Sequence, residues 1–384
     1  GRGVHLPTER QEAALKLVLA GPLPPYRGGI ARHTACLAGA LAAAGCPPAL
    51  LTLRGGYPGW LYPGRASLEP ESLSAPLPAA RLLSGWQPWR WPEAARWLDE
   101  QQVKAILFPW WTPYWGAAYA WLAAFARRRG LRVVYLVHNA LPHEPRPFDQ
   151  LLTRLALRQG QAFIVHNASQ AEALARLLPA APPAHFCPHP TYAHLNDLRL
   201  PKAQARAALD LPADQPILLH FGFLRAYKGL DTLLEALALL RAAGGPTPLL
   251  LAVGERWGGG QALKTQISRL GLDGQVRLMD RYVSEHEAAL AFSAADLFTA
   301  PHARASQSGA LKLALGSGLP ALASAPTLDA RELPIAGLSV LPAGDAPAWA
   351  RGIAAALRTP LPQPRLDAAA GWARLAALVM ELAA

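Results

Sequence analysis

The stretch Phe221-Gly222-Phe223-Leu224-Arg225-Ala226-Tyr227-Lys228-Gly229-Leu230-Asp231 joins a short apolar run to a helix-length segment. A glycine at the end of a strand lets the backbone approach a ligand closely. Arg225 and Lys228 then place two cations where the negative charge of a phosphate would lie, and such charge stabilises a departing diphosphate. The alternative is an ordinary strand-to-helix turn that carries two surface cations.

The same alternation of apolar runs and helical segments continues on both sides of this stretch. It is the pattern of α/β domains with parallel sheets. Predicted strands are 15–20, 49–53, 105–109, 132–138, 162–166, 185–188, 217–221, 249–253, 276–279, 297–300, 319–323 and 338–341. Predicted helices are 30–44, 114–129, 148–158, 169–178, 230–242, 261–270, 284–293 and 309–315, and Ser284 with Glu287 predicts a capping box.

A polar interruption near 197–214, with the pairs Leu200-Pro201 and Leu211-Pro212, breaks the strand rhythm. A chain of 384 residues suits two domains. We therefore expect one domain over 1–196, a second over 197–365, and a last helix within 366–384 that packs back on the first. Ligands of open parallel sheets bind beyond the carboxyl ends of the strands, so the site is expected between the domains.

The order Gly222, Arg225, Lys228-Gly229 resembles the donor-phosphate motif of the family-4 retaining glycosyltransferases. Three further stretches resemble this family in the family's own order, so the resemblance spans nearly the whole chain. They are Leu17-Val18-Leu19-Ala20-Gly21-Pro22 with Gly28-Gly29-Ile30-Ala31-Arg32-His33, then Val134-Tyr135-Leu136-Val137-His138-Asn139, and finally Ala294-Ala295-Asp296-Leu297 with Pro301, Gln307-Ser308-Gly309 and Gly318-Leu319-Pro320.

The resemblance implies an α/β protein of GT-B architecture, in which two Rossmann-like domains face each other across a cleft. It also implies a metal-independent enzyme without a cofactor that moves a hexosyl group, with retention, from a UDP- or GDP-linked sugar to a glycan or lipid-linked acceptor. Its catalytic residues would be His138, Arg225 and Lys228, with His138 positioning and stabilising the reacting sugar. Its donor-binding residues would be Gly28, Gly29, Gly222, Arg225, Lys228, Gln307, Ser308 and Gly309.

One departure from the family concerns two glutamates that usually lie eight positions apart and contact the donor. Counted back from Pro320, they should fall near 305–306 and 313–314, where none of the residues is acidic. A variant branch in which Gln307 and Ser308 replace them is one interpretation, and a catalytically degenerate GT-B binding protein is another. A nucleotide-sugar epimerase is a third, although it needs several acidic groups for proton transfer.

Charge and tryptophan are concentrated in the first half of the chain. Residues 1–195 have a net charge of +9, and residues 196–384 a net charge of +2. The basic half favours phosphates or anionic lipid, and tryptophan favours sugar rings and membrane interfaces. An amphiphilic acceptor is therefore expected, near His143, Glu144, Trp110 and Trp111, although core filling explains many of these rings. Eight of the twelve tryptophans are Trp86, Trp89, Trp91, Trp97, Trp110, Trp111, Trp115 and Trp121.

Several other classes of protein fit this sequence poorly. No run of 18 apolar residues predicts a spanning helix, and three cysteines without ligand spacing indicate core thiols in a reducing compartment. We therefore expect a cytoplasmic protein that contacts an anionic membrane at its inner face. Histidine pairs such as His185 and His189 lie among prolines with few carboxylates nearby, so no metal site is expected. The sequence contains no continuously basic helix of the kind that would indicate nucleic-acid binding.

Overall fold

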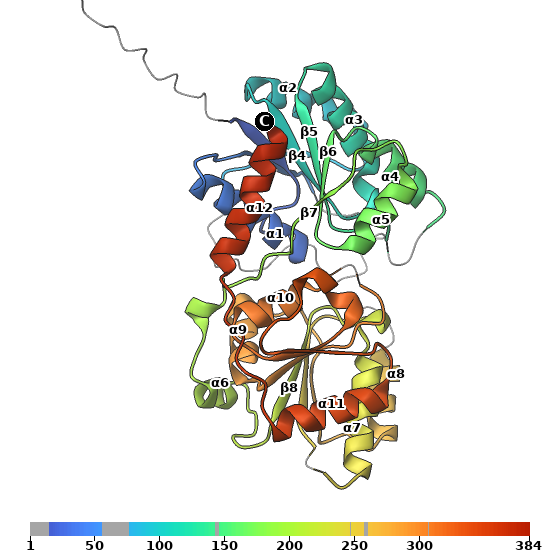
Figure 1. The fold of residues 1–384 in the computed structure, drawn as a ribbon, viewed down its shortest axis with the longest axis vertical. Coiled ribbons are helices and arrows are strands. Elements are labelled where there is room, and N and C mark those ends of the chain that lie inside the picture. Colours follow the sequence, from blue (N-terminus) through green and yellow to red (C-terminus); the bar gives the residue numbers. More distant parts are fainter. Residues whose placement is uncertain (1–14, 56–76, 143–145, 246, 257–259, 306) are drawn as a thin grey trace, which may run out of the picture.

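A computed structural model describes residues 15–55, 77–142, 146–245, 247–256, 260–305 and 307–384 of the chain (Figure 1). The first half forms a seven-stranded parallel sheet in the order β3-β2-β1-β4-β5-β6-β7. Its strands are β1 (Leu17–Ala20), β2 (Ala49–Leu53), β3 (Ala80–Leu83), β4 (Ala105–Trp110), β5 (Arg132–Val137), β6 (Ala162–Val165) and β7 (His185–Phe186). Its helices are α1 (Gly29–Ala43), α2 (Trp91–Glu100), α3 (Gly116–Arg128), α4 (Asp149–Leu157) and α5 (Ala168–Leu177).

The second half forms a six-stranded parallel sheet in the order β10-β9-β8-β11-β12-β13. Its strands are β8 (Ile217–Phe221), β9 (Leu249–Val253), β10 (Val276–Met279), β11 (Leu297–Ala300), β12 (Ala321–Ser324) and β13 (Leu338–Leu341). Its helices are α6 (Lys202–Ala208), α7 (Leu230–Ala242), α8 (Gly260–Arg269), α9 (Glu285–Ala294), α10 (Gly309–Gly316) and α11 (Ala346–Arg358), and α12 (Ala368–Ala383) follows.

Both sheets reverse their winding direction beside their first strand. In the first sheet β1 pairs with β2 and β4, and in the second β8 pairs with β9 and β11, always parallel. The predicted fold class is therefore confirmed: two Rossmann-like sheets in the GT-B arrangement. The reversal point of such a sheet is where ligands bind, so the loops after β1 and β8 are the first places to look for a site.

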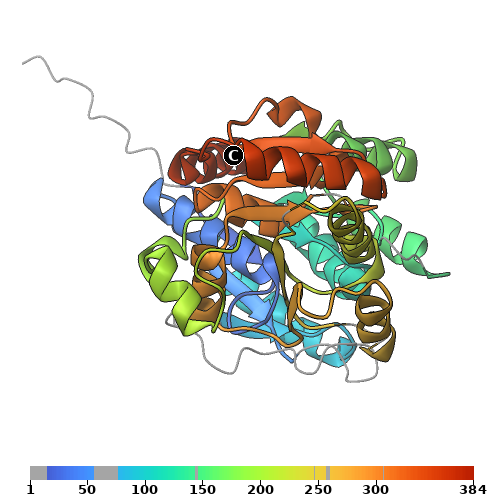
Figure 2. The same cartoon turned by 90° about the horizontal axis from the view of Figure 1, so that it is seen from below.

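Helices cover both faces of each sheet, because alternate strand residues are buried on opposite sides. On one face of the second sheet, Leu218 and Leu250 pack with α7 and α11, and on the other Leu219 packs with α9 and α10. Figure 2 looks along the molecule from this end and shows the sheet between its helical layers. The first sheet is covered by α2, α3, α4 and α5 on one face and by α1 and α12 on the other.

The C-terminal helix α12 returns to the first half of the molecule, where it packs against α1 (Figure 1). Leu375 and Val379 of this helix lie in a hydrophobic cluster that also contains Leu19 of β1 and Phe292 of α9. One continuous apolar core therefore reaches from the first sheet to the second. This shared core holds the carboxyl ends of the two sheets close together.

Most predicted strands and helices are present within a few residues, and the capping box of Ser284 and Glu287 is confirmed at the start of α9. The sequence missed β3, α2, α6 and α11. The helix α6 lies in the stretch that was interpreted as a polar linker, where buried Arg206 bonds to Asp296 and to backbone carbonyls. No helix among the described residues is long and apolar enough to cross a membrane.

Candidate active site

The loop between β8 and α7 contains two glycines with positive φ angles, Gly222 at 115° and Gly229 at 73°. Positive φ is costly for residues with a side chain and is readily adopted by glycine. A Cβ on Gly229 would lie 2.1 Å from the carbonyl oxygen of Pro301, at the end of β11. The loop is thus pressed onto the neighbouring strand end, at the reversal point of the second sheet.

Arg225 and Lys228 lie at either end of the short 3-10 turn Ala226–Lys228 in this loop. Both cations lie over the ring of Tyr227: the Arg225 Cζ is 5.2 Å and the Lys228 Nζ 5.8 Å from its centroid. Burial, and secondarily the Arg225 guanidinium, lower the pKa of Lys228 to about 8. Two cations this close to a helix N-terminus favour a bound anion, which would relieve their repulsion.

The corresponding loop of the first sheet lies between β1 and α1. Gly28 has a φ of 113° and Gly29 begins α1, and a Cβ on either glycine would meet nothing within 4 Å. The arginines that flank these glycines pair with carboxylates of the second half: Arg27 lies 3.9 Å from Glu255, and Arg32 forms an ion pair with Glu285. This loop is therefore part of the contact between the two halves.

His138 directly follows β5 and is 2% exposed. Its backbone N–H donates to Trp110 at 2.8 Å, which extends the ladder between β5 and β4. Gln307 of the second half donates from Nε2 to the His138 Nδ1 at 3.3 Å. Ser308 caps α10 by accepting from the Leu311 N–H at 3.3 Å, and Gly309 is the first residue of that helix. The structure therefore brings His138 and the segment Gln307–Gly309 together from opposite halves.

Three further buried histidines lie close to His138. Their positions in the sequence did not predict that they form a group. The centroid of the His33 ring lies 4.7 Å from that of His138, 5.2 Å from that of His166 and 5.1 Å from that of His189. Burial lowers the pKa of all four, to about 4 for His166, so these rings are neutral at pH 7. They come from α1 and from the ends of β5, β6 and β7, so no short sequence motif reveals them.

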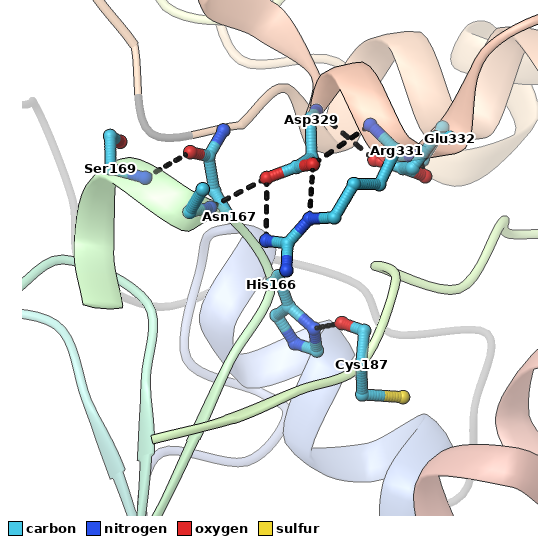
Figure 3. A network of polar contacts seen from close by, with 9 residues as sticks. His166, Asn167, Ser169, Cys187, Asp329, Arg331 and Glu332 are labelled. Atoms are coloured by element: carbon cyan, nitrogen blue, oxygen red, sulfur yellow. Dashed lines mark hydrogen bonds and ion pairs between the residues drawn. The ribbon is translucent and has the colours of Figure 1, made fainter. Parts of the chain in front are cut away.

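Acidic residues also reach this region, from the segment after β12. Asp329 accepts from the Ala168 N–H, at the start of α5, at 2.5 Å, and its carboxylate also binds Arg331 (Figure 3). These bonds, chiefly those from Arg331, lower the pKa of Asp329 to about 2. Glu332 forms a buried ion pair with Lys312 of α10. Asp329 and Glu332 thus bring carboxylates to the start of α5 and to α10, whereas residues 305–306 and 313–314 carry none.

The four predicted acceptor residues differ in where they lie. Trp110 is 0% exposed and packs in the core of the first half, so it offers no ring face to an acceptor in this state. Trp111 is partly buried and packs against Trp115 and Tyr119. His143 and Glu144 lie outside the described residues. The three cysteines are free thiols, and Cys46 and Cys187 are buried, in keeping with core thiols.

Comparisons with known proteins agree with this architecture. Residues 27–191 match the family model described as Glycosyltransferase Family 4, and residues 215–359 match that described as Glycosyl transferases group 1. A GDP-mannose:glycolipid 4-beta-D-mannosyltransferase of Xanthomonas campestris pv. campestris is 29% identical over 203 residues. That match covers 50% of this chain and 50% of the relative, so the chain spans about half the length of this curated relative.

Two solved structures share the fold over almost the whole chain. HepE of Anabaena, in complex with UDP, has a TM-score of 0.67 at 17% identity and covers 96% of this chain and 95% of its own. Sucrose-phosphate synthase of Thermosynechococcus elongatus has a TM-score of 0.64 at 19% identity, with 96% and 94% covered. The two family models match successive parts of the chain, residues 27–191 and 215–359, and the solved structures share its GT-B fold. The chain therefore belongs to the family-4, group 1 glycosyltransferases.

Proposed function

We propose that this chain transfers a hexosyl group from a nucleoside-diphosphate sugar to a glycan or lipid-linked acceptor. Residues 1–196 would bind the acceptor and residues 197–365 the donor. One observation carries the proposal: Arg225 and Lys228 lie together at the reversal point of the second sheet, and Gln307, also of the second half, contacts His138 of the first. Positive charge for a leaving diphosphate and a buried polar group for the sugar are thus supplied by facing halves.

The cations of the second half and the histidine of the first have different parts in this reaction. The diphosphate would bind Arg225, Lys228 and the start of α7, which stabilise the charge that develops as the bond from the anomeric carbon to phosphate breaks. The acceptor oxygen would form the new bond on the same face, and its proton would pass to the departing phosphate oxygen. His138 would position the sugar. No divalent metal is needed, because the two cations already neutralise the leaving group.

An inverting transfer is the alternative stereochemical course. It needs a base that removes the acceptor proton, and the neutral His138 is the candidate. Burial lowers the pKa of His138, which weakens the ring as a base and favours the retaining course. Product NMR decides between the two courses. From an α-linked donor, an α-linked product supports retention, and a β-linked product would instead make His138 the base.

The donor base and the acceptor are taken from what the relatives bind. The mannosyltransferase of Xanthomonas is named for GDP-mannose and a glycolipid, whereas HepE is a complex with UDP. Sequence identity is higher to the former, so we place GDP-mannose first and UDP-glucose second as donors. A lipid-linked acceptor fits the same relative, which is named for a glycolipid.

An exposed aromatic surface supports such an acceptor. Trp86 and Trp89 are 54% and 68% exposed, and Phe148 and Leu151 are 72% and 55% exposed. Trp86 and Trp89 follow Gly85, which lies against Tyr114 of the turn Pro113–Trp115. Phe148 and Leu151 lie at the start of α4, which packs on the same turn. Aromatic side chains of this kind favour a membrane interface. Flotation with anionic vesicles should capture the protein, and Trp89→Ala with Phe148→Ala should reduce capture several-fold.

A thermal-shift panel of GDP, UDP, ADP, dTDP and their sugar conjugates tests donor binding. A ligand at 100 times its Kd adds about 2.7 kcal/mol to stability, so one nucleotide should raise the midpoint selectively. Incubation of that donor with polyprenyl-diphosphate-linked glycans should then yield a glycosylated lipid. A shift without transfer would favour a degenerate binding protein, and a changed donor sugar without acceptor would favour an epimerase. No shift with any nucleotide would overturn the proposal.

A further inference from the structure

The buried histidines are also suited to a role that is independent of the sugar donor. The ligand nitrogens of His33, His138 and His166 all lie within 4.8 Å of one another, and the three residues are buried. His33 projects from α1, His138 follows β5 and His166 follows β6. Three imidazoles from three separate elements thus converge on one point, at the contact between the two halves.

The spacing of these rings matches that of imidazoles around one metal ion. Tetrahedral zinc with Zn–N bonds of about 2.0–2.1 Å holds its ligand nitrogens about 3.3 Å apart and the ring centroids about 5 Å apart. The Nε2 atoms of His33 and His166 are 3.2 Å apart, and the three centroid separations are 4.7, 5.2 and 5.6 Å. The ligand nitrogens lie within 4.8 Å of one another, so the rings would have to move closer together when an ion binds.

Hydrogen bonds around the rings direct lone pairs toward the same point. His166 Nδ1 donates to the Cys187 carbonyl at 2.7 Å, so its Nε2 presents a lone pair to His33. A carbonyl that orients the far nitrogen is the usual arrangement behind a histidine ligand. As the structure stands, the Gln307 Nε2 donates to the His138 Nδ1, which leaves the ring proton on the His138 Nε2. A metal ligand at that nitrogen therefore requires the Gln307 amide to turn, so that its Oε1 accepts from a protonated Nδ1 and the His138 Nε2 gains a lone pair.

Two nitrogens of the cluster have no hydrogen-bond partner among the described residues, although both are buried. They are the His138 Nε2 and the His33 Nδ1. A buried polar atom without a partner costs free energy, and an ion bound to the His138 Nε2 would satisfy that atom. His33 would offer its Nε2, which faces His166, so its Nδ1 would stay without a partner among the described residues. Besides burial, the positive charge of Lys312 contributes to the lowered pKa of His166 and His189 and opposes a cation there, and Lys312 also forms a buried ion pair with Glu332.

We propose that His33, His138 and His166 form a three-imidazole site for a borderline transition-metal ion, with Zn²⁺ as the first candidate. Neutral imidazole suits Zn²⁺, Cu²⁺ and Ni²⁺ and is a poor ligand for Mg²⁺ or Ca²⁺. The fourth position is left to a water molecule or an anion. The ion enters when the two halves separate, since Gln307 of the second half covers His138.

A metal ion at this site would affect the transfer reaction, a consequence that rests on the proposed function. Transfer needs no metal in that proposal, and His138 acts through a ring nitrogen near the sugar. A metal bound to His138 occupies that nitrogen, so Zn²⁺ acts as an inhibitor that competes for the site. The same ion ties α1 to β5 and β6, so it also raises thermal stability.

Metal binding is measured directly on the metal-free chain, without donor or acceptor. Equilibrium dialysis against Zn²⁺ should give one ion per chain with a Kd of about 1 μM or lower, and Co²⁺ should give the intense visible bands of four-coordinate cobalt. His166→Gln should weaken binding at least 100-fold. His189→Gln is the matched control, because its ring packs on the same cluster and its nitrogens are not among the three that converge.

Thermal melts in chelator establish that each variant is folded before its binding is compared. Binding of less than 0.2 Zn²⁺ per chain at about 10 μM free metal would overturn the proposal, and so would equal weakening by His166→Gln and His189→Gln. Mg²⁺ should not bind to the cluster. Because this readout uses no sugar nucleotide, a failure to bind zinc leaves the proposed transferase untouched, and absence of transfer leaves the metal result standing.

Discussion

The two glycine loops that follow the first strand of each sheet look alike in sequence and differ in structure. The loop after β8 presses Gly229 onto Pro301 and crowds Arg225 and Lys228 around one tyrosine ring. The loop after β1 ends in Gly28 and Gly29, at which a Cβ would meet nothing within 4 Å, and the arginines that flank them pair with Glu255 and Glu285. Only the second-half loop holds concentrated positive charge, so the diphosphate should bind there and the first-half loop should serve closure of the two halves.

Substitution of Gly229 and of Gly28 should show the largest difference between the two loops. Gly229→Ala places a Cβ against the Pro301 carbonyl at a positive φ, so we expect the free energy of unfolding to fall by about 3 kcal/mol or more. Gly28→Ala meets only the backbone strain and should lose about 1–2 kcal/mol. Urea titration measures both losses. Equal losses in the free energy of unfolding would show that Pro301 moves to make room for the Cβ and that the two loops are packed alike.

Removal of one cation from each half tests where the diphosphate binds. Lys228→Ala should weaken nucleotide affinity at least tenfold, about 1.4 kcal/mol, because a charged partner of the phosphate is lost. Arg32→Ala, whose guanidinium already pairs with Glu285, should change it less than about threefold. Calorimetric titration with the nucleotide found in the thermal-shift panel provides the numbers. A larger effect of Arg32→Ala would assign the phosphate to the first half.

The pH dependence of nucleotide affinity sharpens the same comparison. Lys228 carries a lowered pKa of about 8, so its charge is present at pH 7 and lost as the pH rises through 8. Nucleotide affinity should therefore fall about five- to tenfold between pH 7 and pH 9. Lys228→Arg stays charged and should flatten this profile. An unchanged slope in Lys228→Arg would mean that another group titrates.

The smallest effect should come from the ion pair between the halves. Glu285→Gln removes the carboxylate that Arg32 contacts, and both side chains are partly exposed, at 16% and 19%. We expect a loss of less than about 1 kcal/mol in the free energy of unfolding, and a smaller loss at high salt. The measurement is a pair of urea titrations at low and high salt. A loss above about 2 kcal/mol would make this pair a main support of closure.

How far the sequence predicted the fold depended on how local its signals were. Strands such as Ile217–Phe221 and Leu249–Val253 are continuous apolar runs bounded by turn residues, and both are present with the predicted ends. Ser284 and Glu287 form a local cap and were predicted as well. The helix α6 was missed, because buried Arg206 depends on Asp296, which lies about 90 residues away.

The site residues also divide into those with a local sequence signal and those that depend on long-range contacts. Gly222, Arg225, Lys228 and Gly229 lie within eight residues. Their spacing fitted a phosphate loop and an ordinary turn equally, and the family resemblance favoured the phosphate loop. Their roles stay predictions until a nucleotide is tested. The missing glutamates were correctly noted as absent from 305–306 and 313–314. The sequence did not predict that Asp329 and Glu332 reach the same region from another loop.

The sequence by itself determined the two parallel sheets, the glycine turn with its cations and the order of the family's motifs, because each depends on residues a few positions apart. Only the tertiary structure decided that His33, His138 and His166 share one point, that Gln307 contacts His138, and that Trp110 lies in the core. These depend on strand order and on the docking of the two halves. Residues more than 100 positions apart in the chain become neighbours only when both sheets are complete.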